Sequence, residues 1–149
     1  MGSEMCIRDS LNPEDLVLEC ADPNIATLTA AWVANNGNGV ASDVCSEVEW
    51  TAVALEPIAG CGTTSETPYL FTVTDECDNS STRFASVITE NTTPPEIVVP
   101  EELVVECDGA GNEMEFTAWL NSVSGSSQCG EVTFESNLYN TISGCGGNN

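Results

Sequence analysis

Cysteines are the residues of this chain whose type and spacing point most directly to chemistry. The sequence holds eight of them in 149 residues, with no Cys-x-x-Cys pair and no histidine. Structural zinc sites usually bring two such ligands within a few residues of each other. Cys20, Cys45, Cys61 and Cys77 are instead 25, 16 and 16 residues apart, which suits loops stapled across a fold. The cysteines therefore predict disulfides and an oxidising location: secreted, periplasmic or at the cell surface.

A second group of chemically capable residues lies in one short acidic segment. Asp75, Glu76, Asp78 and Asn79 carry oxygen atoms of the kind that calcium binds. Their spacing is not that of a known calcium loop, so a solvated turn is the alternative interpretation. The sequence requires no cofactor, and calcium is the one candidate.

Two tripeptides fit the N-glycosylation acceptor pattern, Asn79-Ser-Ser and Asn91-Thr-Thr. Such tripeptides also arise by chance. A glycan on Asn79 would protrude from the turn between two strands, which is compatible with a coated surface protein.

The composition lacks the residues that many catalytic sites need. Without histidine or lysine, the Ser-His, Cys-His and Ser-Lys nucleophile systems are unavailable. Paired carboxylates can cleave glycosides, but nothing singles out one pair among the 24 acidic residues. We therefore expect that the chain is not an enzyme.

The charge of the chain is strongly one-sided. The 24 acidic residues face two basic ones, Arg8 and Arg83, for a formal net charge of −22. Such a surface repels nucleic acid and anionic membranes. No run of about 18 apolar residues is present, so no membrane insertion is expected either.

The elements that carry these residues are repeated once along the chain. Segment 13–20 returns as segment 100–107 with six identities in eight positions, and Ala31-Trp-Val returns as Ala118-Trp-Leu. The offset is 87 residues up to the tryptophan and 84 from Cys45 and its counterpart Cys129 onward. A repeat of this kind indicates modular architecture. We expect modules at residues 13–93 and 94–149, after an N-terminal segment 1–12 that is either a non-native start or an ordinary strand of unrelated sequence.

Short alternating runs, bounded by Gly, Asn, Ser and Pro, recur through both modules. They are typical of β-strands with one buried face, and two of them flank a turn-rich segment, 75–80, that predicts a hairpin. The expected fold class is all-β, with two tandem immunoglobulin-like antiparallel β-sandwich modules, the second incomplete. The alternating positions are Val48, Trp50 and Ala52; Val132 and Phe134; Tyr69, Phe71 and Val73; and Phe84, Ser86 and Ile88.

The large aromatic residues are the expected core of these sandwiches. They are Trp32, Trp50, Trp119 and Phe134. We expect one strand to pass through Trp32, and the one candidate for a helical turn lies around Trp32 or Trp119. A sugar-stacking role for one tryptophan is the alternative interpretation.

Strand direction suggests which cysteines pair. Each strand carries the chain to the opposite end of a sandwich, which places Cys20 and Cys61 at one end and Cys45 and Cys77 at the other. A disulfide needs Cα atoms within about 7 Å of each other. The favoured bridges in the first module are therefore Cys20–Cys61 and Cys45–Cys77.

The same reasoning in the second module favours Cys107–Cys145 and leaves Cys129 unpaired. Sequence alone does not prove connectivity. An extra short strand between Cys45 and Cys61 would also change which ends these cysteines reach.

The end of the first module resembles a known repeat family. The run Tyr69-Leu-Phe-Thr-Val-Thr-Asp-Glu-Cys-Asp-Asn-Ser-Ser, then a strand, then Thr92-Thr-Pro-Pro-Glu-Ile, is similar to the junction between two hyalin-repeat-like modules. The sequence departs from the family where a glycine is usual, at Asp78, and where Cys-Pro is usual, at Val99-Pro100. The resemblance implies an immunoglobulin-like fold and a structural or adhesive role in secreted bacterial surface proteins.

The second module has no counterparts of the strands through Phe71 and Phe84, because Asn149 corresponds to residue 65 of the first copy. Two explanations remain open: a piece of a longer array, or completion by strands from a neighbouring copy, as in filaments. Both predict an extracellular structural or adhesive protein whose partners are copies of itself or adjacent modules, with surface glycans as further candidates. The alternative function is a carbohydrate-binding module of a secreted enzyme, with Tyr69 and Tyr139 as its spare aromatic residues.

Overall fold

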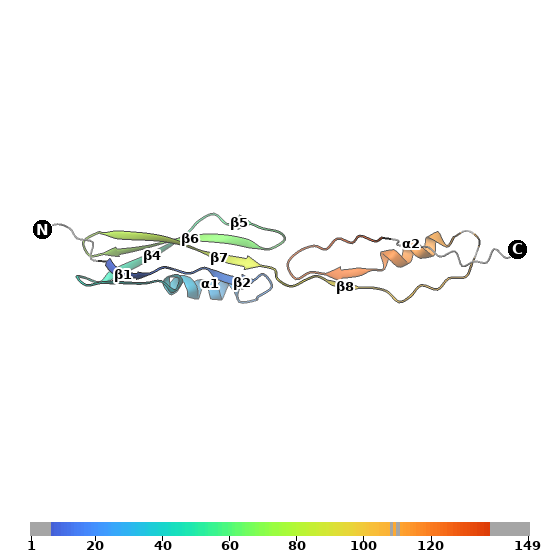
Figure 1. Ribbon diagram of the computed structural model, residues 1–149, viewed down its shortest axis with the longest axis horizontal. Coiled ribbons are helices and arrows are strands. Elements are labelled where there is room, and N and C mark those ends of the chain that lie inside the picture. Colours follow the sequence, from blue (N-terminus) through green and yellow to red (C-terminus); the bar gives the residue numbers. More distant parts are fainter. Residues whose placement is uncertain (1–6, 108, 110, 138–149) are drawn as a thin grey trace. The chain divides into compact units, whose positions relative to one another are not determined.

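The chain forms two compact units. The computed structural model describes residues 7–107, 109 and 111–137 (Figure 1). The first unit comprises Met1–Thr92 together with Gln128–Gly130, and the second comprises Thr93–Ser127 and Glu131–Asn149. Strands dominate the first unit, so the expectation of a mainly β chain is confirmed.

A five-stranded sheet forms the body of the first unit. Strands β6 and β7 make a long antiparallel hairpin, β4 and β5 pair antiparallel with β6, and β2 pairs parallel with β7. The alternating runs identified in the sequence at Val48 and Tyr69 are thus strands β4 and β6. The bounds are β2 (Leu16–Glu19), β4 (Val48–Ala54), β5 (Ile58–Ala59), β6 (Ser65–Asp75) and β7 (Ser80–Glu90).

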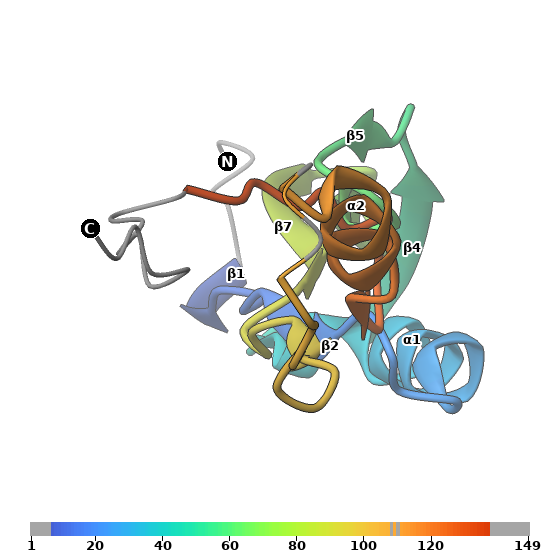
Figure 2. The ribbon, with the colours of Figure 1, turned by 90° about the vertical axis from the view of Figure 1, so that its right-hand side faces the viewer.

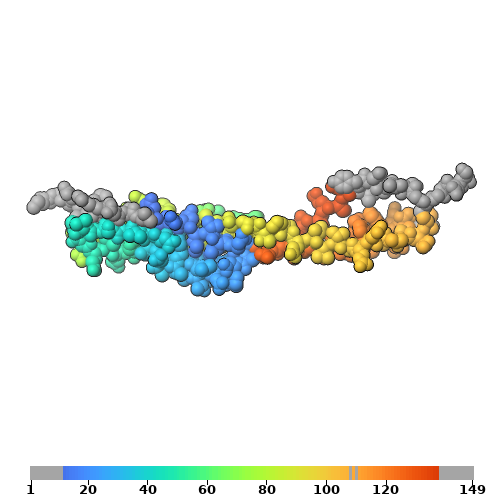
Figure 3. All heavy atoms as spheres, turned by 60° about the horizontal axis from the view of Figure 1, so that its bottom comes forward, coloured from blue at the N-terminus to red at the C-terminus, as the bar shows by residue number. Residues whose placement is uncertain are grey.

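Helix α1 (Ile25–Ala34) takes the place of the strand that the sequence predicted through Trp32. Four of its ten residues are alanine, the residue with the highest helix propensity. The helix is followed by the short 3-10 helix η1 (Asn36–Asn38), where Gly37 adopts φ +63°, a conformation that favours glycine and ends a helix. Figure 2 shows α1 beside β2, and in Figure 3 its light-blue residues lie on the surface of the first unit.

The core of the first unit lies where α1 meets the sheet. It consists of Trp32, Phe71, Ala85 and Val87, each no more than 5% exposed. Trp32 therefore belongs to the core, as expected, and Phe71 and Val73 confirm the alternation of β6. On β7 the sequence predicted that Phe84 lies on the buried face, but Phe84 is 66% exposed. The buried face of β7 is instead formed by Ala85 and Val87.

Each half of the chain has a two-stranded ribbon, with one strand before the helix in sequence and the other after it. In the first unit β1 (Ile7–Leu11) pairs with β3 (Val40–Asp43), and in the second β8 (Glu96–Val98) pairs with β9 (Ser124–Ser126). The registers are equivalent: Leu11 faces Val40 as Val98 faces Ser124, at the repeat offsets of 87 and 84 residues. Strand β1, which falls in the segment 1–12 expected to lie outside the modules, is thus the counterpart of β8.

The second unit contains helix α2 (Glu113–Asn121), the counterpart of α1. Both helices fix their tryptophan in the same way. Trp32 Nε1 donates a hydrogen bond of 2.9 Å to the Glu14 carbonyl, and Trp119 Nε1 donates one of 2.7 Å to the Glu101 carbonyl. The repeat seen in the sequence is therefore a structural repeat of ribbon, helix and tryptophan anchor.

The sheet of the first unit is not reproduced among the described residues of the second. Segment 103–106 corresponds to β2 and segment 132–137 to β4, yet both are irregular. The predicted strand through Val132 and Phe134 is thus wrong, and Phe134 is 49% exposed instead of belonging to a core. In the first unit β2 pairs with β7 and β4 pairs with β6, and no such partner strands lie among the described residues of the second unit.

Candidate functional site

A disulfide at one end of the first sheet joins the two repeats. Cys20, directly after β2, is bonded to Cys129, with Cα atoms 5.9 Å apart. This bond takes the place of the predicted Cys20–Cys61 bridge and corrects the expectation that Cys129 is unpaired. Cys129 is 3% exposed and lies in the short segment 128–130 that belongs to the first unit.

Strand directions place the cysteines at the ends that the sequence reasoning gave them. Because β2 and β7 run in parallel and β6 runs against β7, Cys20 and Cys61 lie at one end of the sheet. Segment 128–130 docks at this end: Thr63 N donates to the Cys129 carbonyl at 2.8 Å. Cys61 remains an exposed thiol two residues away from that contact. The sequence reasoning missed this docking because the contact joins residues that are 66 positions apart in the chain.

Gly62 makes this docking possible. It adopts φ +61°, and a Cβ atom added to it would collide with the carbonyl oxygen of Cys129. The Gly-Cys-Gly sequence around Cys61 was the signal available in advance, since a glycine at a close backbone approach often has this role.

At the opposite end of the sheet lie Cys45 and Cys77, both exposed free thiols. Their neighbours touch, because Glu76 N donates a hydrogen bond of 3.4 Å to Ser46 Oγ. The predicted Cys45–Cys77 bridge is therefore not formed in this structure, although the end that each cysteine occupies is the predicted one. Cys107 is disulfide-bonded, and its predicted partner Cys145 lies outside the described residues.

Asp75 organises the acidic turn between β6 and β7. Its carboxylate accepts hydrogen bonds from Cys77 N at 2.8 Å, Asn79 N at 2.9 Å and Asn79 Nδ2 at 2.9 Å. The side-chain bond from Asn79, with the two backbone bonds, lowers the pKa of Asp75 from its ordinary value of 3.8, against the opposing effect of burial. Both carboxylate oxygens are thus used inside the turn, and Asp78 adopts φ +62° at its tip.

Acidic side chains gather around a shallow hollow beside this turn. The hollow has a volume of about 380 Å³, and its acidic lining includes Glu47, Glu49, Glu76 and Asp78. Within the described part of the chain, no three aspartate, glutamate, cysteine or histidine side chains are arranged to hold a metal ion. The calcium site on Asp75, Glu76, Asp78 and Asn79 stays a prediction, in which Asp75 is already engaged by amide donors.

The two predicted glycosylation positions differ in their surroundings. Asn91 is exposed, while Asn79 is half-buried and its Nδ2, the atom that carries an N-glycan, donates to Asp75. Tyr69, one of the two spare aromatics for sugar stacking, packs edge-on against Trp32 with ring centroids 5.4 Å apart. It is therefore part of the core, and Tyr139 lies outside the described residues.

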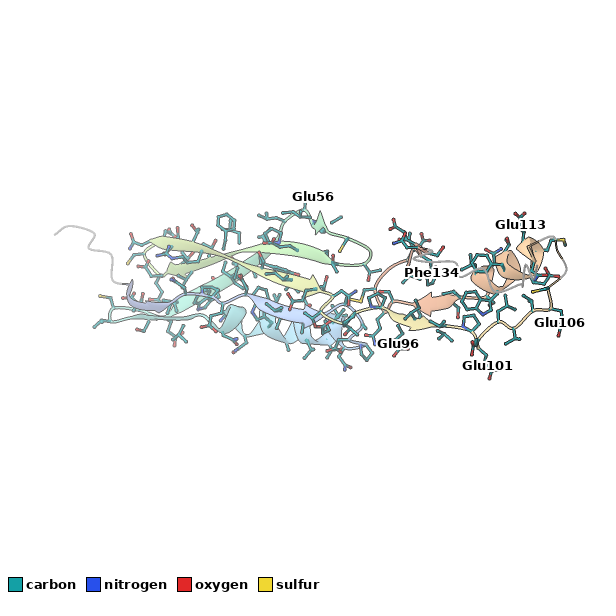
Figure 4. All side chains as sticks on the ribbon, turned by 45° about the vertical axis from the view of Figure 1, so that its right-hand side comes forward. Glu56, Glu96, Glu101, Glu106, Glu113 and Phe134 are labelled. Atoms are coloured by element: carbon teal, nitrogen blue, oxygen red, sulfur yellow. A yellow bond between two sulfur atoms is a disulfide. The ribbon has the colours of Figure 1, made fainter. Side chains whose placement is uncertain are left out.

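An apolar groove in the second unit is a further candidate site. It has a volume of about 630 Å³, and its apolar lining is formed by Leu103, Val105, Phe116 and Trp119. Glu102 and Glu113 line it as well, and Glu113 projects from the start of α2 (Figure 4). The sequence signal for this groove was a repeated tryptophan without the repeated aromatic strand that covers its counterpart.

No family model, curated protein or solved structure matches this chain. None of the helices in the described residues is both long and apolar enough to span a bilayer. The candidate site therefore rests on the geometry of the two repeats.

Proposed function

We propose that this chain is an extracellular structural or adhesive protein, made of β-rich repeat modules that join in a cell-surface array or a filament. The observation that carries this proposal is the equivalence of its two halves in ribbon register, helix and tryptophan anchor. Among the residues that the structure describes, a hairpin covers the tryptophan of the first half alone. A repeat that leaves apolar surface open is suited to burial against a neighbouring repeat.

The Cys20–Cys129 bond supports a mechanical role. It ties a residue of the first repeat to a residue of the second, 109 positions along the chain. A bond of this kind resists the separation of consecutive repeats under load. It also favours an oxidising location at the cell surface or outside the cell.

The immunoglobulin-like assignment and the likeness to hyalin repeats belong to this proposal. The five-stranded sheet and the helix packed on it form a β-rich module, which is compatible with this assignment. The net charge of −22 keeps such modules soluble and disfavours nucleic acid as a partner. Copies of the chain, and glycans on the surface it coats, are the partners proposed.

Electron microscopy with analytical ultracentrifugation tests the proposal directly. The oxidised protein is compared over a hundredfold range of concentration, with and without reductant. Regular filaments, or a mass that rises with concentration, are expected in oxidising buffer. A monomer over the whole range, without binding to cell-surface material, would refute a structural role through self-association.

A further inference from the structure

The groove of the second unit and the core of the first unit are built on equivalent residues. Leu103 and Val105 correspond to Leu16 and Leu18 at the repeat offset, and Trp119 corresponds to Trp32. In both units the tryptophan donates to a carbonyl 18 residues earlier. The floor of the groove is therefore built like the floor of the first core.

What covers this floor in the first unit is known in detail. Trp32 is 5% exposed, because Phe71 and Tyr69 of β6 pack edge-on against it at centroid distances of 5.2 and 5.4 Å. Beside them β7 pairs with β2, so that Leu16 faces Val87 and Leu18 faces Thr89. Both covering strands belong to one hairpin.

Neither cover is present over the groove of the second unit in the described residues. Trp119 is only half-buried and stacks on Phe116 at a centroid distance of 6.2 Å. Phe116 is 36% and Val105 is 38% exposed. Segment 103–106, nearly identical in sequence to β2, is irregular. Within the described part of the chain, this apolar surface and the backbone of segment 103–106 thus lack the strand partners that their counterparts have in the first unit.

We propose that this groove is the acceptor site for a second hairpin of the β6–β7 type, held by another module of the same repeat. The strand equivalent to β7 pairs in parallel with segment 103–106 and converts it to a strand. The strand equivalent to β6 lays its alternate aromatic side chains over Trp119. This inference rests on the proposed function and names the contact by which modules associate.

The register of the bound hairpin follows from the first unit. Leu16 faces Val87 there, so Leu103 is paired with the residue equivalent to Val87. The positions equivalent to Tyr69 and Phe71 then meet the Trp119 ring. Recognition comes from the alternation of aromatic residues along one strand and from the backbone ladder along the other.

A synthetic hairpin tests this inference with the full chain. The probe is a peptide with the sequence of residues 65–90 and the substitution C77S, which removes its thiol. The matched control peptide carries Y69S and F71S in addition. Binding is measured by fluorescence anisotropy of the labelled peptides, in about 0.15 M salt so that repulsion between acidic surfaces is screened.

We expect the probe to bind at least about tenfold more tightly than the control, because its two aromatic side chains are buried in the groove. Hydrogen exchange should slow in segment 103–106 and in α2. The variant F116S should weaken binding by about tenfold. The variant M114S, at an 84% exposed position of the same helix, should not.

Equal binding of the two peptides, or slowed exchange confined to the first unit, would overturn the inference. So would F116S and M114S variants that bind alike. Filaments seen in the absence of peptide binding would leave the proposed function standing and place the contact elsewhere. Peptide binding by a chain that forms no filaments would support this groove while counting against self-association.

Discussion

The two tryptophans offer a comparison in which one residue type occupies equivalent positions with and without its cover. We expect W32A to cost about 3–5 kcal/mol, as for large aromatic side chains removed from cores. Trp32 is 5% exposed and forms edge-on pairs with Phe71 and Tyr69, each worth about 0.5–1.5 kcal/mol beyond burial. Against a total of about 5–15 kcal/mol for a domain, W32A removes a large part of the stability of the first unit.

W119A should cost only about 1 kcal/mol. Trp119 is half-buried, and it loses a single hydrogen bond to the Glu101 carbonyl and its stacking on Phe116. Both variants lose the same indole and the same kind of backbone bond. The difference between them therefore isolates the contribution of the β6–β7 hairpin.

Native-state hydrogen exchange measures each unit separately. Protection of α1 and β6 should fall by about a hundredfold or more in W32A, and protection of α2 by less than about tenfold in W119A. A loss in W119A as large as that in W32A would refute the reasoning, because Trp119 would then have a cover equivalent to that of Trp32.

Two further outcomes are expected. In G62A the added Cβ collides with the Cys129 carbonyl, so non-reducing peptide mapping should find less of the Cys20–Cys129 bond. The control G130A should retain the bond, because its Cβ meets only an ordinary contact at 3.4 Å. Equal amounts of the bond in both variants would contradict the docking. The lowered pKa of Asp75 means that its ionised form stabilises the fold fully above the ordinary value of 3.8, and that this stabilisation is lost as the pH falls through the lowered value. The urea midpoint of the wild type should therefore exceed that of D75N at neutral pH, and this gap should close below pH 3.8; a gap that is unchanged down to pH 2 would exclude this origin.

The features that the sequence predicted correctly depend on local pattern. The alternation around Phe71, the turn at Asp75 and the repeat itself are all visible within short windows. The ends of the sheet reached by the four cysteines of the first module also follow from strand order. The cysteines lie at the predicted ends even though α1 replaced one of the assumed strands, because the pairing of β4, β6 and β7 fixes these ends.

The errors lie where partners distant in the chain decide the outcome. Phe84 reads as the buried residue of its strand, yet the hairpin register puts Ala85 and Val87 on the core side. Cys61 was the favoured partner of Cys20, and both lie at the same end of the sheet. Docking of segment 128–130 across Gly62 selects Cys129, and no spacing rule encodes that contact.

Two nearly identical segments show most directly why sequence reasoning stops where it does. Leu16-Val-Leu-Glu is a strand, and Leu103-Val-Val-Glu is irregular. Strand propensity is no lower in the second segment, where valine replaces leucine, so propensity does not explain the difference. Among the described residues, only the first segment pairs with a hairpin strand. The second unit has a segment with strand propensity, an apolar floor and an anchored tryptophan, so a bound hairpin would complete a second core there. Association between modules would on this view complete a fold and form a contact in the same step, which couples the stability of each module to that of its neighbour.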